Sequence, residues 1–356
     1  MNPFNYALAA VALGVVATAQ AGLVDGSQAD YRPLVVVGAP SSDGIGGALP
    51  YIDLNDDQFT GTVQLQYFGN RYCSGSLLPS GRHILTAAHC VTYGGGTPYP
   101  DFSSDSIQFD GPGGEHVDIG FRSVTVNPGW TFDYTGNGND LAIIELTTAA
   151  PSWAERYDLY TGNAVGTDYT RIGYGGFGWG DTGSIYGGIT ADGENLLRVF
   201  GSNHFDGDNA ELCYMIGWNC SGGGVLTSDF DNLYDLDGDG IGDNDLWGQL
   251  FYNFDGGNLA YVNGPTSHEA GSAPGDSGGT LLVNGMLAGV TSYGFSFGCV
   301  YFDYDCGLNS SWGEGMTDTS VAWHYDWITA NSVPEPGVLA LFGVGLLGLS
   351  LRRRKS

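Results

Sequence analysis

Two short segments far apart in the chain carry side chains that could do chemistry together. The segment Thr86-Ala87-Ala88-His89-Cys90 offers an imidazole, and Gly275-Asp276-Ser277-Gly278-Gly279 offers a hydroxyl in a glycine-rich turn. Between them, Asp140 leads into an apolar run. A serine hydroxyl attacks a carbonyl carbon when a base takes its proton, and an acid orients that base. The sequence therefore predicts Ser277 as a nucleophile, His89 as its base and Asp140 as the orienting acid.

Short strands must position these groups. Segments with strand-like alternation or apolar character lie over residues 62–67, 83–86, 117–126 and 141–146. The segments 280–283 and 286–291 flank Asn284-Gly285, a pair that suits a type I′ hairpin turn. These patterns predict an all-β protein.

One helix is expected near the end of the chain, over residues 319–330. Asp318 or Thr319 would be its N-cap. Its apolar face would carry Val321, Trp323, Trp327 and Ile328.

The composition favours a globular, turn-rich and acidic protein. Hydrophobic residues make up 42% of the 356 residues, which is ample for a core, and the 60 glycines indicate many turns. The formal net charge of −28 argues against binding to nucleic acid, whose phosphates attract Lys and Arg. We read the excess of carboxylates as a solvated surface that also favours divalent cations.

Both ends of the chain have the character of targeting segments. Residues 6–19 are almost wholly apolar and are followed by Ala19-Gln20-Ala21, a small-x-small cleavage pattern, so residues 1–21 are predicted to be a signal peptide. At the other end, Pro334-Glu335-Pro336 precedes an apolar run over 338–351 and a basic cluster over 352–355. That run has only 14 residues, whereas a spanning helix needs about 20.

Six cysteines in an exported chain favour disulfides. Six cysteines allow 15 pairings, and zinc is disfavoured because no C-x2-C spacing occurs. The close spacing of the cysteines in sequence suggests the pairs Cys73–Cys90, Cys213–Cys220 and Cys299–Cys306.

The chain resembles trypsin/chymotrypsin-type serine proteases over about residues 59–331. The likeness rests on Cys73-Ser74-Gly75-Ser76-Leu77-Leu78, on the segments around His89, Asp140 and Ser277, and on a terminal helix that ends in Asp326-Trp327-Ile328. It implies two packed six-stranded antiparallel barrels with the active site between them. It also implies a Cys73–Cys90 bridge, an oxyanion hole made by the N–H groups of Gly275 and Ser277, and a Ser292 hydroxyl that supports the acid.

The resemblance also places the substrate pocket. The residue six positions before the nucleophile, Gly271, would form the pocket base, and Ser292-Tyr293-Gly294 would pair with the substrate backbone. An uncharged base implies a preference for apolar or aromatic residues before the scissile bond, unless Glu269 intrudes and restores a basic preference.

Two departures from the family pattern stand out. Ala273 occupies the place of a cysteine, which leaves Cys299 to pair with Cys306. The usual activation sequence, a basic residue followed by Ile-Val-Gly-Gly, is absent, and Val36-Val37-Gly38 is its nearest echo. The partner of Asp276 is therefore open.

The tail over residues 333–356 resembles the PEP-CTERM sorting signal of Gram-negative bacteria. The resemblance implies transient membrane anchoring, removal by an exosortase-type enzyme, and a final place at the cell surface or in the extracellular matrix. An ordinary membrane anchor is the alternative. Residues 22–58 are then an N-terminal extension, and the protease-like domain contains an acidic insertion over about 203–263.

The insertion contains a candidate calcium loop. Its ligands, by analogy with an EF-hand, would be Asp235, Asp237, Asp239, the Ile241 carbonyl and Asp243. Position 12 of that loop is Leu246 rather than an acid, and a solvated acidic turn is the alternative reading. Calcium would be structural, since the predicted chemistry requires no cofactor.

The resulting hypothesis is an exported serine endopeptidase that acts on polypeptides through an acyl-enzyme. The alternative is a non-catalytic or latent surface or matrix binding protein on the same fold, and a serine esterase is a third reading.

Overall fold

The first half of the chain closes a six-stranded barrel in the order β2-β3-β4-β7-β6-β5. The computed structural model describes residues 36–43, 49–67, 70–93, 96–99, 101–131, 138–186, 198–215, 224–232, 244–249, 264, 266–296, 303–304 and 307–332. The barrel strands are β2 (Thr62–Tyr67), β3 (Asn70–Leu77), β4 (His83–Thr86), β5 (Asp105–Gly111), β6 (Glu115–Val126) and β7 (Ala142–Leu146). Alternate apolar residues such as Val63 and Leu65 on β2, and Ile107 and Phe109 on β5, are fully buried and fill the barrel.

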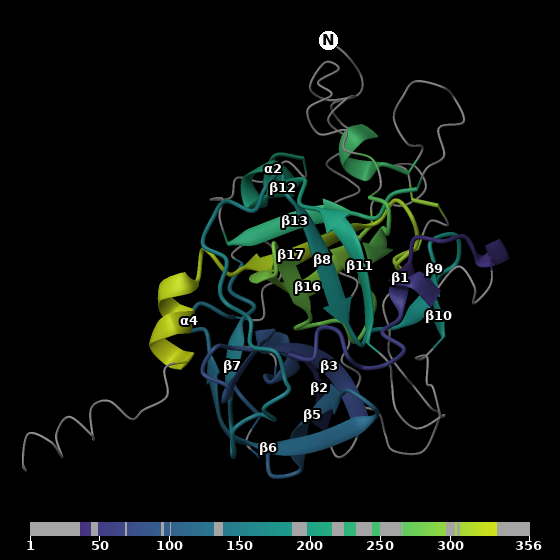
Figure 1. Ribbon diagram of the computed structural model, residues 1–356. Helices are drawn as coiled ribbons and strands as arrows, with labels where there is room; N and C mark the ends of the chain where they lie inside the picture. The colour runs from purple at the N-terminus through teal and green to yellow at the C-terminus, as the bar shows by residue number, and fades with distance from the viewer. Residues whose placement is uncertain are drawn as a thin grey trace, which may run out of the picture.

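The second half forms a seven-stranded antiparallel sheet in the order β11-β8-β15-β16-β17-β13-β12. Its strands are β8 (Asp168–Gly173), β11 (Val199–His204), β12 (Gly207–Asp208), β13 (Val225–Asp229), β15 (Thr280–Val283), β16 (Met286–Phe295) and β17 (Gly315–Ser320). Figure 1 shows the barrel below this sheet, with the helix α4 (Tyr325–Ser332) beside β7. The expected all-β, trypsin-like architecture with a C-terminal helix is confirmed; its first body is a closed six-stranded barrel, and its second is a seven-stranded sheet.

A smaller four-stranded sheet contains the earliest strand of the described chain. Its order is β10-β9-β1-β14, with strands β1 (Val36–Val37), β9 (Phe177–Trp179), β10 (Gly183–Tyr186) and β14 (Ala270–Gly271). Val36 pairs with Gly271 and Val37 with Ala270 in antiparallel register, while β1 runs parallel to β9. Val36 and Val37 are thus fully buried against the predicted pocket base.

Short helices complete the described secondary structure. They are the 3-10 turns Ser41–Asp43, Leu49–Tyr51 and Ala88–Cys90, and the α-helix α2 (Asn209–Met215).

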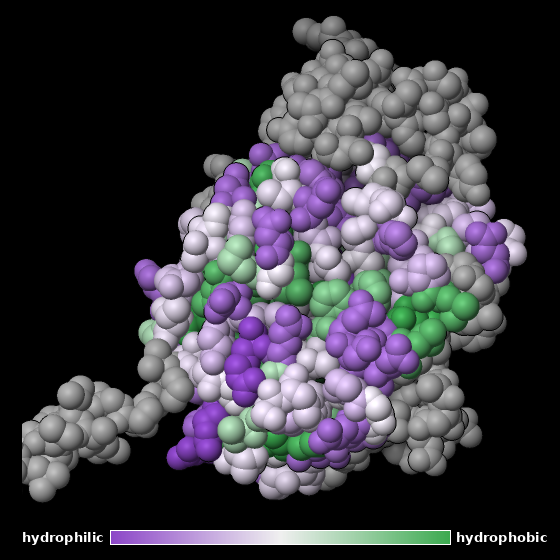
Figure 2. Space-filling model, viewed as in Figure 1, coloured by the Kyte–Doolittle hydropathy of each residue, from purple (hydrophilic) through white to green (hydrophobic). Residues whose placement is uncertain are grey.

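The two halves share one core. Ile172, Leu282 and Val290 from the second sheet belong to the same buried cluster as the barrel residues. On the face drawn in Figure 2, apolar residues show as green patches among polar ones, several of them at the level of the second sheet of Figure 1. This packing holds together the segments that carry His89 and Ser277, because each comes from a different half.

The predicted hairpin is confirmed. Asn284 and Gly285 both have positive φ, at 52° and 77°, as a type I′ turn between β15 and β16 requires. Asparagine and glycine tolerate this left-handed backbone better than other residues.

The predicted start of the terminal helix is wrong. Thr319 and Ser320 lie in β17, where Thr319 pairs with Val290 of β16 and with Val225 of β13. The helix begins instead at Tyr325. Val321 and Ile328 are fully buried, but Trp323 is 60% exposed and does not belong to the apolar face.

Several predictions fall outside the described residues. These are the signal peptide, the tail over 333–356, the candidate calcium ligands Asp235, Asp237, Asp239, Ile241 and Asp243, and the cysteines Cys220, Cys299 and Cys306. Among the residues that the structure describes, no helix is long and apolar enough to cross a membrane.

Candidate active site

Asp140 holds His89 through two hydrogen bonds. The Nδ1 atom of His89 lies 2.7 Å from Asp140 Oδ2, and the backbone N–H of His89 donates to Asp140 Oδ1 at 2.9 Å. His89 lies in the 3-10 turn after β4, and Asp140 lies just before β7, which pairs with β4. The barrel pairing therefore brings the two residues together across 51 positions of sequence.

Asp140 is kept ionised despite its burial. Burial alone would raise its pKa, but the nearby His89 and hydrogen bonds from His89 and Ser292 lower the pKa below its ordinary value. Ser292 Oγ donates to Asp140 Oδ2 at 2.6 Å. An ionised carboxylate only accepts hydrogen bonds, so Nδ1 of His89 is the donor in its bond to Asp140.

The Ser277 turn is fastened to the first barrel. The backbone N–H of Ser74 donates to the Ser277 carbonyl at 2.8 Å, and the Ser74 hydroxyl donates to the Gly275 carbonyl at 3.1 Å. The Cys90 sulfur, next to His89, lies 3.6 Å from the same Ser277 carbonyl oxygen. Ser277 therefore lies beside the segment that carries His89, and its side chain is partly exposed.

Glycines give this turn its shape. Gly275 and Gly278 have φ of 102° and 80°, which residues with a side chain rarely adopt. A Cβ at Gly278 would lie 2.1 Å from Thr86 Oγ1 and 2.3 Å from the Ser74 carbonyl oxygen. Within the described residues, no hydrogen bond joins the Ser277 hydroxyl to His89. Such bonds are often long without substrate and tighten when substrate binds.

The predicted Cys73–Cys90 disulfide is present. It joins β3 to the 3-10 turn that carries His89. The bridge therefore fixes this turn, which also lies against the Ser277 carbonyl. Cys213 is also disulfide-bonded.

Asp276 is fully buried beneath the turn. It accepts the backbone N–H of Gly175 at 2.7 Å and that of Ala273 at 2.9 Å. Burial raises its pKa to about 7, and the Ala273 N–H, the Arg171 guanidinium and the Gly175 N–H act in the opposite direction. Arg171 itself forms a buried ion pair with Asp318 at 3.0 Å.

The base of the predicted pocket is apolar. A Cβ at Gly271 would lie 2.8 Å from the ring of Phe230, so that ring covers the glycine. Phe230 packs with Val36, Ala273, Trp312 and Met316 in a buried cluster. The Glu269 carboxylate is turned to Thr266, whose N–H and hydroxyl donate to it at 2.8 and 2.6 Å.

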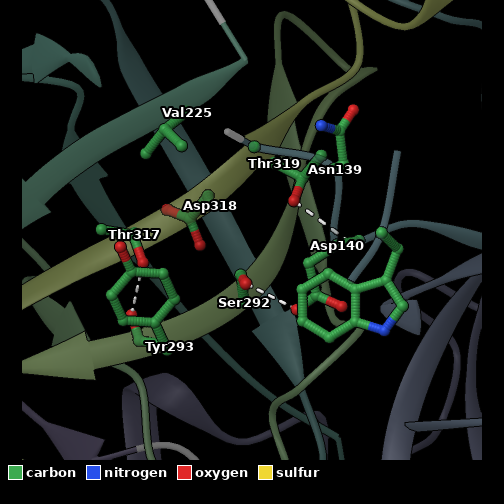
Figure 3. Close-up of a pocket in the computed structure, with 10 residues that line it drawn as sticks. Asn139, Asp140, Val225, Ser292, Tyr293, Thr317, Asp318 and Thr319 are labelled. Carbon is green, nitrogen blue, oxygen red and sulfur yellow. Dashed lines mark hydrogen bonds between the residues drawn. The ribbon is translucent and has the colours of Figure 1, made fainter. Parts of the chain in front are cut away.

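A hollow lies beside Asp140. Figure 3 shows Ser292 and Thr319 directed toward Asp140, with Tyr293 and Thr317 at the opposite side of the hollow. Thr317 Oγ1 donates to the Tyr293 carbonyl at 2.8 Å, which joins β17 to the strand predicted to pair with substrate. The hollow therefore adjoins Tyr293 of that predicted substrate strand.

Two family models match parts of this chain. Residues 54–184 match the family model Trypsin, and residues 332–355 match the PEP-CTERM protein-sorting motif. Residues 54–184 are therefore similar to a trypsin-type domain. The trypsin-type domain supports the assignment as a serine protease, and the sorting motif implies export and processing by exosortase. A solved structure of neuropsin, a serine protease expressed in the limbic system of mouse brain, is 16% identical over 78% of this chain and 96% of that chain, with a TM-score of 0.46.

Three residues make contacts that the sequence did not predict. Ser74 joins the two barrels at the Ser277 turn, Asp318 pairs with Arg171, and Phe230 covers Gly271. Ser74 directly follows Cys73 in the motif over residues 73–78 that carries the family resemblance, and that motif is the sequence signal for its role. Phe230 lies in a segment with no regular pattern.

Proposed function

We propose that this protein is an exported serine endopeptidase that hydrolyses polypeptides through an acyl-enzyme. The observation that carries the proposal is the buried, ionised Asp140 that holds His89 by two hydrogen bonds beside the Ser277 turn. A binding protein has no physical need for a histidine oriented by a buried carboxylate next to a serine in a glycine-rich turn.

The reaction would proceed in two stages, acylation and then deacylation of Ser277. Ser277 Oγ attacks the scissile carbonyl carbon while its proton passes to Nε2 of His89. The imidazolium then gives that proton to the leaving amine as the C–N bond breaks. Water attacks the resulting ester with His89 again as base, which releases the acid and restores Ser277. The N–H groups of Gly275 and Ser277 would stabilise the negative oxygen, each worth about 3 kcal/mol.

We further propose a preference for apolar or aromatic residues before the scissile bond. Gly271 carries no charge, and the ring of Phe230 covers it. The Glu269 carboxylate is committed to Thr266, which disfavours a basic preference through that residue. Transient anchoring through the tail before exosortase processing is part of the same proposal.

A fluorophosphonate that labels activated serines tests the activity. The full chain should be labelled, whereas Ser277→Ala and His89→Ala should not be, although both remain folded. Cleavage of a denatured protein substrate would separate a peptidase from an esterase. Absence of labelling in folded, exosortase-processed protein would favour the alternative, a non-catalytic or latent binding protein.

A further inference from the structure

Four buried aspartates from distant parts of the chain meet behind the pocket base. Asp206 lies between β11 and β12, Asp229 ends β13, Asp231 follows it, and Asp245 lies in the insertion. Each is at most 6% exposed. Figure 1 shows β12 and β13 on the side of the sheet away from the first barrel.

The carboxylates of this cluster are close enough to share one ion. Asp229, Asp231 and Asp245 each offer an oxygen, and all three oxygens lie within 4.8 Å of one another. Two oxygens bound to the same calcium ion can be at most about 5 Å apart, since Ca–O distances are 2.3–2.6 Å. The Asp229 carboxylate also contacts the carboxylates of Asp206 and Asp231.

Asp231 supplies a separate observation that points to a ligand. Asp231 is only 5% exposed, and among the described residues its Oδ1 atom has no hydrogen-bond partner. An unsatisfied buried carboxylate oxygen costs more free energy than almost any other polar atom. The charged groups that act on Asp231 are themselves carboxylates, namely those of Asp229, Asp245, Glu269 and Asp206.

The described arginines of the interior do not neutralise this cluster. Arg171 is paired with Asp318 at 3.0 Å, and Arg198 is paired with Asp53 at 3.0 Å. Two oxygens of the cluster accept backbone N–H groups, from Trp247 to Asp229 at 2.7 Å and from Gly248 to Asp245 at 2.5 Å.

We propose that Asp229, Asp231 and Asp245 bind one calcium ion, with Asp206 beside them. Oxygen donors alone select hard cations, and calcium accepts an irregular set completed by carbonyls or water, whereas magnesium demands a regular octahedron. The ion would fasten the insertion to β13. Because Phe230 directly follows Asp229 and covers Gly271, calcium would also steady the pocket base.

This site differs from the loop over Asp235–Asp243 that the sequence singled out. The two candidates are separable by matched substitutions, Asp231→Asn for the cluster and Asp239→Asn for the loop. Both variants remove one carboxylate and keep the side-chain shape.

Titration calorimetry with calcium chloride on the EDTA-treated full chain tests the proposal. We expect one site in the wild type, at least about tenfold weaker binding in Asp231→Asn, and unchanged binding in Asp239→Asn. Calcium at a hundred times its Kd should raise the Tm of the wild type by about 4 °C. Magnesium at the same concentration should raise it less.

Thermal unfolding of the calcium-free proteins gives an independent readout. Without calcium, Asp231→Asn should have a higher Tm than the wild type, because it removes repulsion between carboxylates; with calcium the order should invert. No calcium binding by the wild type, or binding lost in Asp239→Asn and kept in Asp231→Asn, would overturn the proposal. None of these measurements depends on peptidase activity.

Discussion

The carboxylate of Asp276 lies against Gly175, whose backbone N–H donates to Asp276 Oδ1 at 2.7 Å. This contact places a buried acid directly before Ser277. Burial raises the pKa of Asp276 to about 7, so the folded protein binds a proton there more tightly than the unfolded chain, whose aspartates titrate near 3.9. Asp276 therefore destabilises the folded protein least below about pH 4, where it is protonated in both the folded and the unfolded state. Its free-energy cost to folding grows as the pH rises and levels off above about pH 7.

Replacing Asp276 by Asn should stabilise the protein in a pH-dependent way. Asn is uncharged like the protonated acid, but its amide nitrogen cannot accept the second backbone N–H, so the variant should be no more stable than the wild type near pH 4. From pH 4 to pH 8 the stability of the variant relative to the wild type should rise by roughly 4 kcal/mol, three pKa units of difference. The charges of Arg171 and Asp318, which act on Asp276, are common to both proteins. Urea unfolding at pH 4, 6 and 8 measures this, and a difference that stays constant with pH would contradict it.

Gly175→Ala should destabilise the fold by about 3 kcal/mol. A Cβ at this position would lie 2.2 Å from Cγ of Asp276, which cannot move away without losing its hydrogen bonds to the backbone. Gly120→Ala is the control, since the nearest atom to its Cβ is 3.8 Å away. Denaturant unfolding of both variants should show a loss in the first and little change in the second; equal losses would refute the explanation.

Ser292→Ala should lower kcat/KM by a factor of about ten, with the fold preserved. The hydroxyl donates to Asp140 at 2.6 Å, and a hydrogen bond to a charged group is worth about 1.5–3 kcal/mol. Ser123→Ala is a matched control, because Ser123 Oγ also donates to a carboxylate, that of Glu145, far from His89. Steady-state kinetics on a peptide substrate would count against the role of Ser292 if both variants behaved alike.

Gly271→Asp should not create a preference for Lys or Arg. The new side chain would meet the Phe230 ring within 2.8 Å, so the carboxylate would be displaced or buried against an apolar surface. We expect cleavage after Phe to fall and cleavage after Arg to stay negligible, measured with a matched pair of chromogenic peptides. Efficient cleavage after Arg by this variant would show that the pocket base is open.

Replacing both Cys73 and Cys90 by Ser should cost about 3 kcal/mol of stability. The bridge closes a loop with a sequence separation of 17, and the chain-entropy estimate for such a loop is of that size. Urea unfolding of the variant against the oxidised wild type gives the difference. Equal stabilities would mean that packing around the bridge, and not the bond, holds the His89 turn.

The sequence predicted the parts whose signals are local. The alternation over 62–67 predicts a strand, and the Asn284-Gly285 pair predicts a turn, without reference to the rest of the chain. Both are present in the structure. The helix start failed at Thr319 because its capping signal was overridden by pairing with two strands that are distant in sequence.

Contacts made by the irregular insertion were beyond sequence reasoning. Nothing in the spacing of Asp206, Asp229 and Asp245 indicates that they meet, since their meeting depends on how β12 and β13 pair. The regular spacing of acidic residues over 235–243 placed the calcium prediction in that loop instead. The covering of Gly271 by Phe230 was hidden for the same reason.

The small strand β1 sets the minimum length of any working fragment. The match to the trypsin family begins at residue 54, yet Val36 and Val37 lie between β9 and β14, and Asp53 is the partner of the buried Arg198. A gene that starts at residue 54 would expose two unpaired strand edges and would remove Asp53, the nearest carboxylate to the buried Arg198, leaving Asp56 at 3.7 Å. Expression designs, and any search for shorter relatives, should start upstream of residue 36.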